Sequence, residues 1–275
     1  SSWYFLRYID SKNNKKFADF KKLKYWLPID LYNGGMEHTT LHLLYSRFWH
    51  KFLFDIGVVP TKEPYAKRIS HGMVLAEDGK KMSKSLGNVI NPDDIISKYG
   101  ADTLRMYEMF MGPFSEAIPW STQGMIGVKR FLHKVWNLFS KAQKQAIECT
   151  SCNKLLHKTI KKTTKDIDNF RFNTAISQLM ILVNAMQKKK NITIANYELL
   201  LTLLSPFAPH ITEELWLKIG HKKSIHLEKW PEYDEKLIKE DEIELLVQIN
   251  GKLRDKIKVL ADITEQDAKE KALKS

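Results

Sequence analysis

A short loop in the first third of the chain holds the residues best suited to phosphate chemistry. Between Gly79 and Asn88 lie three lysines and two serines, flanked by glycines that leave the backbone adaptable. Nucleotidyl transfer needs positive charge matched to the charge that spreads over phosphate oxygens, and lysine supplies it as a point charge. The glycine, lysine and Ser/Thr order of a Walker A loop is absent. The residue types alone therefore leave two readings open, a polyphosphate clamp and a solvated surface loop.

A second cluster combines two glycines, a carboxylate and two histidines. Gly34 and Gly35 precede Glu37 and His38, and His42 follows four residues later. We expect a strand-to-helix junction here, where backbone approaches a nucleotide closely and Glu37 accepts from ribose hydroxyls. The two histidines share a helix face, which also suits a metal, but the His-Glu-x-x-His order is missing. We predict no metal; two histidines packed at a helix–sheet junction are the alternative.

The two cysteines do not form a recognisable metal or redox motif. Cys149 and Cys152 have half-site spacing, but no second cysteine pair follows them. His157 could add a third ligand, whereas a structural zinc site normally needs four. We expect two ordinary reduced thiols.

The charge balance points to a polyanionic partner. Lysine and arginine total 44 against 32 aspartates and glutamates, a net charge of +12. Nucleic acid is the leading candidate and an acidic membrane the second. Lys129, Arg130 and Lys134 lie on one predicted helix near Trp136, as a phosphate-binding face or a solvated one. No signal peptide or long apolar run is visible, so we expect a cytoplasmic protein without a membrane span.

The first zone of the chain, to about residue 116, has an α/β pattern. The apolar stretches 29–32 and 72–75 are typical of strands. Residues 41–54 have the period of a helix that Gly57 ends. This zone is expected to position both clusters.

The second zone, residues 117–236, is predicted to be an all-α bundle. One apolar helix face is formed by residues at three- and four-residue steps: Phe172, Ile176, Leu179, Val183 and Met186. Pro206 and Pro209 interrupt one helix, and Glu213 and Glu214 suit the first turn of the next, which Gly220 ends.

The third zone, residues 237–275, is expected to begin a small α/β unit. Two strand-like runs flank Asn250 and Gly251, a dipeptide that favours a hairpin turn. Thr264 is predicted to cap a final helix with Asp267 three residues on. The unit stops before it can bury a core, and the missing initiator methionine leads us to expect a piece of a longer chain.

The loop sequence resembles a known signature. Lys81-Met82-Ser83-Lys84-Ser85 matches the loop of class I aminoacyl-tRNA synthetases at every position. By that resemblance the loop, including Ser83 and Ser85, closes over ATP and stabilises the pyrophosphate leaving group. Lys84 then carries most of the catalytic role and Lys81 supports it.

The glycine cluster makes the resemblance more specific. Residues 32–47 follow the pattern Tyr-x-Gly-Gly-x-Glu-His-x-x-Leu-His-Leu-Leu-Tyr-x-Arg, which is similar to that of leucyl-tRNA synthetases. The resemblance implies that Gly34, Gly35 and Glu37 hold the adenylate. It also implies roles in the leucine pocket for Ser1, Tyr4, His38 and His42. Adenine then contacts backbone groups of Met73 and Val74, and His71 stands where bacterial relatives usually carry glutamine.

The resemblance covers nearly the whole chain, including residues 204–216 and Trp230-Pro231, which are similar to the anticodon-binding-type bundle. It implies the C-terminal half of a Rossmann-type catalytic domain in residues 1–116, the bundle, and the start of a tRNA-binding C-terminal domain. The implied reaction attaches leucine to tRNA(Leu) through leucyl-adenylate, using ATP and Mg²⁺, in a full-length enzyme expected to be monomeric. The His-Ile-Gly-His signature and the editing domain are not in this sequence, so we expect the fragment alone to be inactive.

Three alternatives remain open at the level of the sequence. An isoleucyl- or valyl-type synthetase would keep the same mechanism. A non-catalytic RNA-binding module would need the basic bundle but has no use for the lysine-serine loop. A natural split-synthetase subunit would need a partner that supplies the upstream half.

Overall fold

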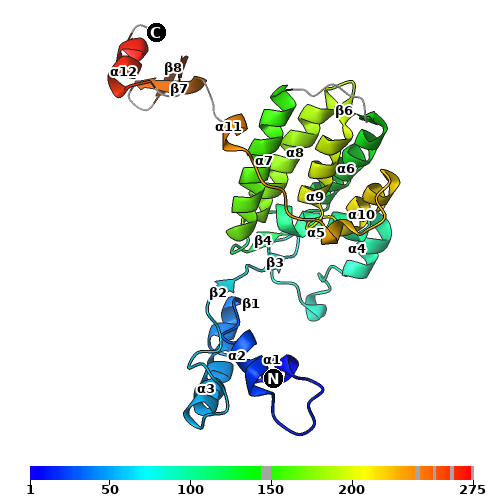
Figure 1. Ribbon diagram of the computed structural model, residues 1–275, viewed down its shortest axis with the longest axis vertical. Helices are drawn as coiled ribbons and strands as arrows, with labels where there is room; N and C mark the ends of the chain where they lie inside the picture. Colours follow the sequence, from blue (N-terminus) through cyan, green and yellow to red (C-terminus); the bar gives the residue numbers. More distant parts are fainter. Residues whose placement is uncertain (144–149, 239–241, 250–251, 261–262, 274–275) are drawn as a thin grey trace. The chain divides into compact units, whose positions relative to one another are not determined.

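The computed structural model describes residues 1–143, 150–238, 242–249, 252–260 and 263–273 (Figure 1). They form two compact units. Unit 1 comprises Ser1–Phe131 with Asn169–Ile176, and unit 2 comprises Leu132–Asp168 with Ser177–Ser275. Cys149 and the predicted Asn250–Gly251 turn lie outside the described residues.

Unit 1 alternates short helices with very short strands. Its α-helices are α1 (Tyr4–Ile9), α2 (Phe20–Trp26), α3 (His42–Asp55), α4 (Pro92–Tyr99), α5 (Ala101–Phe110) and the first part of α6 (Thr122–Leu138). Its strands are β1 (Tyr32–Gly34), β2 (Arg68–Ser70), β3 (Val74–Leu75) and β4 (Ile118–Pro119), and its 3₁₀ turns are η1 (Met36–Thr39) and η2 (Lys84–Leu86).

The first hydrophobic core of unit 1 lies among α1, α2 and α3. Its buried members are Phe5, Leu6, Ala18, Leu23, Leu27, Leu53 and Val59. Helix α2 begins where Asp19 accepts the backbone N–H groups of Lys21 and Lys22, a normal N-cap. Helix α3 confirms the helix predicted over residues 41–54, and Gly57 follows it with a φ of 76°. This core supports the segment that carries the glycine cluster.

The strands of unit 1 are shorter than the apolar runs predicted. Strand β1 pairs in parallel with β2, and β3 pairs in parallel with β4. The prediction over residues 29–32 was displaced, because Ile29 forms only an isolated bridge with Tyr65 and regular pairing starts at Tyr32. The prediction over residues 72–75 was too long, because Gly72 lies against the backbone of Glu116, where a Cβ atom would be 1.7 Å from the carbonyl oxygen. The described strands thus form two-stranded pieces, and the order of a Rossmann sheet stays a prediction.

Unit 2 is built mainly from helices packed side by side (Figure 1). They are the end of α6, α7 (Thr150–Asp168), α8 (Phe172–Gln187, mostly in this unit), α9 (Ile194–Leu204), α10 (Pro209–Lys218) and α11 (Glu235–Ile238). Shorter elements are η3 (Phe139–Lys141), β5 (Ala142–Gln143), β6 (Ile192–Thr193) and η4 (Ile225–Leu227). The predicted apolar face of α8 is confirmed at four positions, all fully buried: Ile176, Leu179, Val183 and Met186.

The break between α9 and α10 falls at the two prolines, as predicted, and Pro209 occupies the first turn of α10. The placement of Glu213 and Glu214 in that first turn was wrong. Because α10 already starts at Pro209, these residues lie in its second turn. There Glu213 accepts hydrogen bonds from the Ser224 hydroxyl and the Ile225 N–H, both at 3.0 Å.

The last zone folds as a β-hairpin followed by a helix. Strands β7 (Glu242–Ile249) and β8 (Lys252–Leu260) pair antiparallel, with an irregularity between Val247 and Gln248. Helix α12 (Glu265–Leu273) has the predicted cap, since Thr264 donates to the Asp267 carboxylate at 2.7 Å and accepts its N–H at 3.2 Å. Among the helices described, none has the length and apolar composition required to cross a membrane.

Candidate active site

A cavity of about 780 Å³ in unit 1 brings most of the predicted site residues together. Among its lining residues are seven of those assigned to the leucine pocket and the adenylate, together with His71: Ser1, Tyr4, Gly34, Gly35, Glu37, His38 and His42. The cavity is lined by α1, β1, η1 and the start of α3. Sequence positions more than thirty residues apart thus meet at one concave surface.

The turn from β1 into η1 explains the two adjacent glycines. Gly34 ends β1 and Gly35 is the N-cap of η1, and both are buried. A Cβ atom on Gly35 would lie 2.3 Å from a carboxylate oxygen of Glu37, so the carboxylate covers this glycine. The helix predicted after the glycines is one 3₁₀ turn before α3 begins at His42. Glu37 is left exposed at the cavity, available to accept a hydrogen bond.

His42 is fixed from both sides of its ring. Its Nε2 lies 3.0 Å from the Ser1 carbonyl oxygen, and its Nδ1 lies 3.1 Å from the Tyr32 hydroxyl. Because a carbonyl oxygen only accepts, Nε2 carries the proton, and in the neutral ring Nδ1 then accepts from Tyr32. The Tyr32 and His42 rings are parallel, with centroids 5.9 Å apart. Both ring nitrogens are engaged, so the imidazole presents mainly its flat carbon surface to the cavity.

His38 keeps one polar atom available. Its Nδ1 is buried without a hydrogen-bond partner among the described residues, and its Nε2 lies 4.0 Å from Glu37.

Burial raises the pKa of the Tyr65 hydroxyl, also on the cavity wall, to about 12. It raises the pKa of Tyr32 as well. Both phenols therefore stay neutral at physiological pH, and the buried wall of the cavity carries little charge.

The lysine-serine loop has a defined internal brace. The Ser83 N–H donates to the Asn88 side-chain carbonyl at 2.8 Å, and the Asn88 amide donates to the Lys81 carbonyl at 3.3 Å. The Ser83 and Ser85 hydroxyls lie 2.8 Å apart. Gly87 supports the turn with a φ of 63°. The Lys81 and Lys84 side chains remain exposed to solvent.

The loop is tied to strand β3. Leu75 and Lys81 form an antiparallel bridge, and the Ala76 N–H donates to the Lys80 carbonyl at 2.8 Å. This places the loop beside the predicted adenine contacts, Met73 and Val74. The Met73 carbonyl already accepts from the Ile118 N–H at 3.0 Å.

Met73 and Val74 do not line the 780 Å³ cavity. They border a second cavity of about 400 Å³, which His71 also lines. The loop residues Lys81, Ser83, Lys84 and Ser85 line neither of the two. The predicted residues therefore form two sets. One set lines the 780 Å³ cavity, and the other consists of Met73, Val74 and the lysine-serine loop, which follow later in the chain.

Two family models match most of the chain. Residues 9–121 match a model described as tRNA synthetases class I (I, L, M and V), and residues 152–269 match the anticodon-binding domain of tRNA ligase. The chain belongs to the class I tRNA synthetases. The cavity and the braced loop both lie within the first matched region.

A solved structure supports the same family over the full chain. The synthetase chain is similar to the agnB2 LeuRS of Agrobacterium radiobacter K84, crystallised as a ternary complex with tRNA and LeuAMS. The match has a TM-score of 0.85 and 34% sequence identity, and covers 99% of this chain. It covers 38% of the LeuRS chain, so the synthetase chain described here spans little more than a third of that protein's length.

The three basic residues predicted to bind nucleic acid all lie on α6. The Lys129 ammonium bonds the Lys98 carbonyl at 3.4 Å and lies 5.5 Å from the centre of the Tyr99 ring. Lys134 donates to the Asn184 side chain at 2.8 Å. Arg130 is exposed. Of the three, Lys129 and Lys134 already have neutral partners, which leave their charge uncompensated.

The described residues of the synthetase contain no group of three or more His, Cys, Asp or Glu side chains placed to hold a metal. His157, considered above with the cysteines, accepts a hydrogen bond from the Asp234 N–H at 3.0 Å. The described residues therefore provide no cluster of ligands that could enclose a Mg²⁺ ion. A Mg²⁺ ion that arrived with ATP would be held chiefly by phosphate oxygens and water.

Some residues of these sites had no assigned role in the sequence interpretation. Tyr32 and Tyr65 line the cavity, and Asn88 braces the loop. The position of Tyr32 two residues before Gly34 could have indicated that Tyr32 lines the cavity, since residues two apart on a strand share a face. Nothing in the local sequence marks Tyr65, which reaches the cavity through the pairing of residues 64–70 with residues 29–34.

Proposed function

We propose that this chain is part of an enzyme that attaches leucine to tRNA(Leu) through a leucyl-adenylate. In the first step a leucine carboxylate oxygen attacks the α-phosphorus of ATP, and the bond to the β-phosphate breaks to release pyrophosphate. In the second step a ribose hydroxyl of the tRNA end attacks the adenylate carbonyl, and AMP leaves. The observation that carries this proposal is the braced lysine-serine loop in a chain that is 34% identical to a LeuRS over 99% of its length.

The exposed lysines of the loop have a clear chemical use in the first step. Pyrophosphate departs with growing negative charge, and the ammonium groups of Lys81 and Lys84 can stabilise that charge without proton transfer. Neither lysine has a carboxylate partner among the described residues, so their charge is available to phosphate oxygens. Ser83 and Ser85 add hydroxyl donors on the same turn.

The 780 Å³ cavity has the features of a site for a small apolar group next to a polar one. Its lining includes the rings of Tyr4 and His42, with centroids 5.4 Å apart. It also includes Gly34, Gly35 and the exposed Glu37, which suit the approach of a ribose. We assign leucine to the two rings and the adenylate sugar to the glycines and Glu37.

Leucine selectivity in this proposal rests on the shape of a neutral pocket. A single methylene yields roughly 1–3 kcal/mol of discrimination. The full enzyme is expected to bind tRNA(Leu) through its helical bundle, with Lys129, Arg130 and Lys134 as candidate phosphate contacts. An isoleucyl- or valyl-type activity is the competing assignment within the same family.

The decisive experiment is amino-acid-dependent ATP–pyrophosphate exchange on the full-length enzyme that contains this chain, with leucine, isoleucine, valine and methionine compared. Leucine-selective exchange is expected. Exchange selective for another of the four would keep the mechanism and overturn the specificity, and no exchange with any amino acid would refute the enzymatic proposal.

A single-residue test follows from the role of Lys84. Lys84→Ala should slow adenylate formation by roughly 10²–10³-fold, the usual cost of removing one donor to a developing charge. Binding of ATP in the ground state should change much less. Pre-steady-state adenylate formation at saturating ATP measures the first quantity, and an unchanged rate would refute the role of Lys84.

A further inference from the structure

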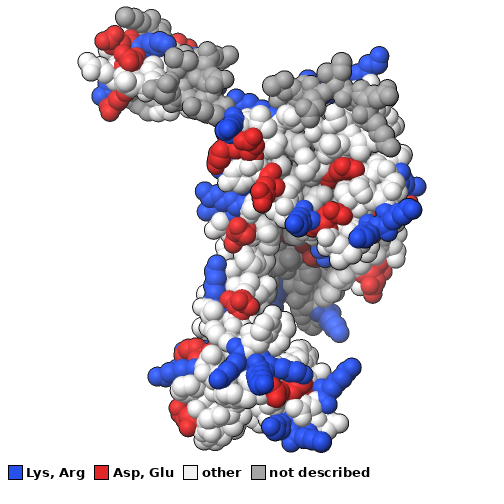
Figure 2. All heavy atoms as spheres, viewed as in Figure 1, with Lys and Arg blue, Asp and Glu red and all other residues white. Residues whose placement is uncertain are grey.

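The strongest concentration of charge in unit 1 lies away from the lysine-serine loop. The segment Arg7–Lys24, here called the basic hairpin, runs from α1 through a loop into α2. It contains seven basic residues and two acidic ones, a net charge of +5 against +12 for the whole chain. In Figure 2, Lys and Arg side chains gather on the surface of the part that is drawn dark blue in Figure 1.

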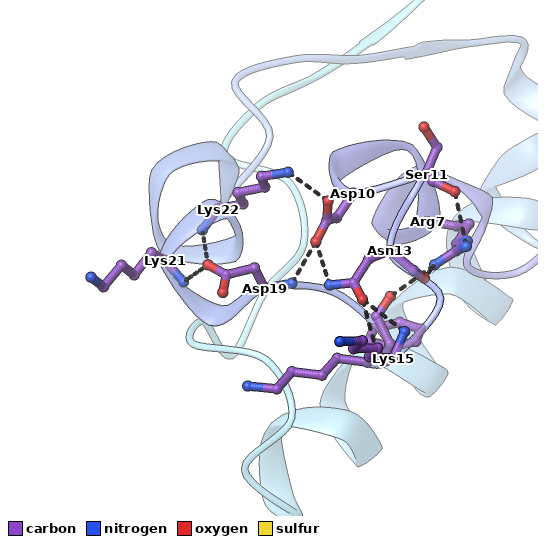
Figure 3. Close-up of polar contacts among 10 residues, drawn as sticks. Arg7, Asp10, Ser11, Asn13, Lys15, Asp19, Lys21 and Lys22 are labelled. Carbon is purple, nitrogen blue, oxygen red and sulfur yellow. Dashed lines mark hydrogen bonds and ion pairs between the residues drawn. The ribbon is translucent and has the colours of Figure 1, made fainter.

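Both carboxylates of the basic hairpin are used to hold its shape. Asp10 is buried and accepts from the Lys22 ammonium, from the Asn13 amide at 2.8 Å and from the Asp19 N–H at 2.9 Å (Figure 3). The hydrogen bond from Lys22 and then that from Asn13 lower the pKa of Asp10 to about 2. Asp19 caps α2. Neither carboxylate is available to neutralise the lysines of the loop.

The loop of the basic hairpin is also fixed through its backbone. Arg7 donates to the carbonyl oxygens of Ser11 and Asn13, both at 2.9 Å. The Asn13 side chain accepts the N–H groups of Lys15 and Lys16, both at 3.0 Å. The cationic side chains are therefore carried by a defined turn, and binding a partner costs little ordering of the backbone.

The ammonium groups themselves point to solvent. Lys12, Lys15, Lys16 and Lys21 are exposed, and none forms an ion pair with any residue that the structure describes. In Figure 3 the Lys15 and Lys21 side chains extend away from Asp10 and Asp19. The hairpin thus presents uncompensated positive charge on a rigid support.

Flat aromatic surfaces lie among these lysines. Four large aromatic side chains on the two short helices are 44–79% exposed: Tyr8, Phe20, Tyr25 and Trp26. Lys24 lies 5.1 Å from the centre of the Phe20 ring, and Tyr25 and Trp26 meet edge to face at 5.0 Å. Lysines bind phosphates, and exposed rings stack on unpaired bases, so the combination fits single-stranded nucleic acid.

We propose that the basic hairpin is an RNA-binding surface that contacts the phosphates and unpaired bases of the tRNA. This inference rests on the proposed function for the identity of the RNA. An anionic membrane is the competing partner for lysines beside Trp and Tyr. Helix α2 has only seven residues, which is short for an amphipathic helix that lies in a membrane interface. The observations therefore favour RNA.

The phosphate contacts are tested by salt dependence. Labelled tRNA(Leu) is titrated with this chain over a range of salt concentrations, and the double variant Lys15→Gln/Lys16→Gln is compared with Lys62→Gln/Lys67→Gln, another exposed pair in the same unit. Each lost phosphate contact should reduce the slope of log K against log salt by about 0.7–0.9, so loss of both contacts should lower affinity near 0.1 M salt roughly 25- to 60-fold if affinity at 1 M salt is unchanged. The control pair should leave the slope unchanged.

The outcomes distinguish failure of the hairpin proposal from failure of the synthetase proposal. If the chain binds tRNA and both double variants keep its slope, the hairpin proposal is refuted and the synthetase proposal stands. If the unmodified chain does not bind tRNA at low salt, the hairpin proposal is refuted, and the synthetase proposal is decided separately by pyrophosphate exchange on the full-length enzyme. If Lys15→Gln/Lys16→Gln abolishes binding to phosphatidylserine vesicles but not to tRNA, the surface belongs to a membrane.

The stacking contacts need a different readout. Trp26→Ala should weaken binding to a single-stranded oligoribonucleotide at least fivefold, since stacking on one base is worth about 1–3 kcal/mol. It should change binding to an RNA duplex of equal length much less. Equal losses for both RNAs would remove the stacking part of the proposal, and circular dichroism establishes that the variant is folded.

Discussion

At the scale of single residues, Asn88 connects the shape of the lysine-serine loop to its proposed chemistry. Its side chain accepts from the Ser83 N–H and donates to the Lys81 carbonyl, so it bonds to the first and the middle residue of the signature. It has no exposed charge of its own to offer to a phosphate. We therefore regard it as a positioning residue for Lys81 and Lys84.

Asn88→Ala should slow adenylate formation in the full-length enzyme by about tenfold, because a misplaced catalytic group loses rate even when it is still present. The dissociation constant of ATP should change by less than the rate. Rapid-quench measurement of adenylate formation tests this, with Leu86→Ala, an exposed side chain of the same turn, as the control. Equal rates for the two variants would contradict the brace.

The ionisation of Asp10 affects the stability of the folded chain. Its pKa is depressed to about 2 in the folded chain, whereas an unfolded aspartate titrates near 4. A depressed pKa contributes stability that is present above about pH 4 and is lost as the pH falls towards 2. Asp10→Asn should therefore lower the midpoint of thermal unfolding at pH 6, and the difference from the unmodified chain should shrink between pH 4 and 2.

The matched control for this change is Asp30→Asn, an exposed carboxylate of the same unit. Its unfolding midpoint should follow that of the unmodified chain at every pH. A difference for Asp10→Asn that stays constant from pH 6 to pH 2 would show that the Asp10 charge does not stabilise the hairpin.

At the scale of elements, the packing of α6 against α9 is anchored by one tyrosine. Tyr197 is fully buried, and its hydroxyl donates to the Val135 carbonyl at 3.0 Å. Burial raises the pKa of this phenol, which therefore stays protonated and keeps donating. The contact joins residues 62 positions apart in the chain.

Two substitutions at this position separate the hydrogen bond from the packing. Tyr197→Phe should lower the free energy of unfolding by about 0.5–1.5 kcal/mol, the usual value of one hydrogen bond. Tyr197→Ala should lower it by about 3–5 kcal/mol, because it also leaves a cavity. Urea denaturation followed by circular dichroism measures both, with the partly exposed Tyr233→Phe as the control. Similar losses for Phe and Ala would mean that packing contributes little.

The elements also show what the sequence can predict and where it stops. The 3.6-residue period correctly predicted α3 and the buried face of α8, because a helix buries residues on one side and that pattern is local. Strand lengths could not be predicted in the same way. Pairing at Ile29 depends on residues 64–66, and Gly72 is fixed by the distant Glu116 backbone.

The same difference between local patterns and contacts between distant residues applies to the candidate sites. Motif residues within one short segment, such as Lys81 to Ser85, are visible in the local sequence, but their assignment to ATP came from the family resemblance and stays a prediction. The approach of Ser1 to His42 and of Tyr65 to Tyr32 depends on tertiary packing. Helix α3 shows the limit clearly, since Leu44, Tyr45, Phe48 and Phe52 have a helical spacing and yet remain 47–67% exposed. An apolar period predicts the helix but does not identify what covers it.

At the scale of the whole molecule, the net charge of +12 is the property that partners and solvent act on. Like charges on one folded chain repel one another, and this self-repulsion opposes the compact state. Several of the strongest local pairs, such as Glu63 with Arg47 and Lys51, already neutralise their carboxylates in place. The remaining surplus must be balanced by ions from solution.

Raising NaCl from about 20 to 200 mM should therefore raise the midpoint of thermal unfolding, because the Debye length falls from tens of ångströms to about 8 Å or less and screens the surplus lysines. A polyanion such as heparin at the same ionic strength should raise it further, since it binds the folded surface and stabilises by mass action. Differential scanning calorimetry at constant pH measures both effects. If the midpoint falls with salt, surface ion pairs outweigh the self-repulsion, and the net charge does not destabilise the folded chain.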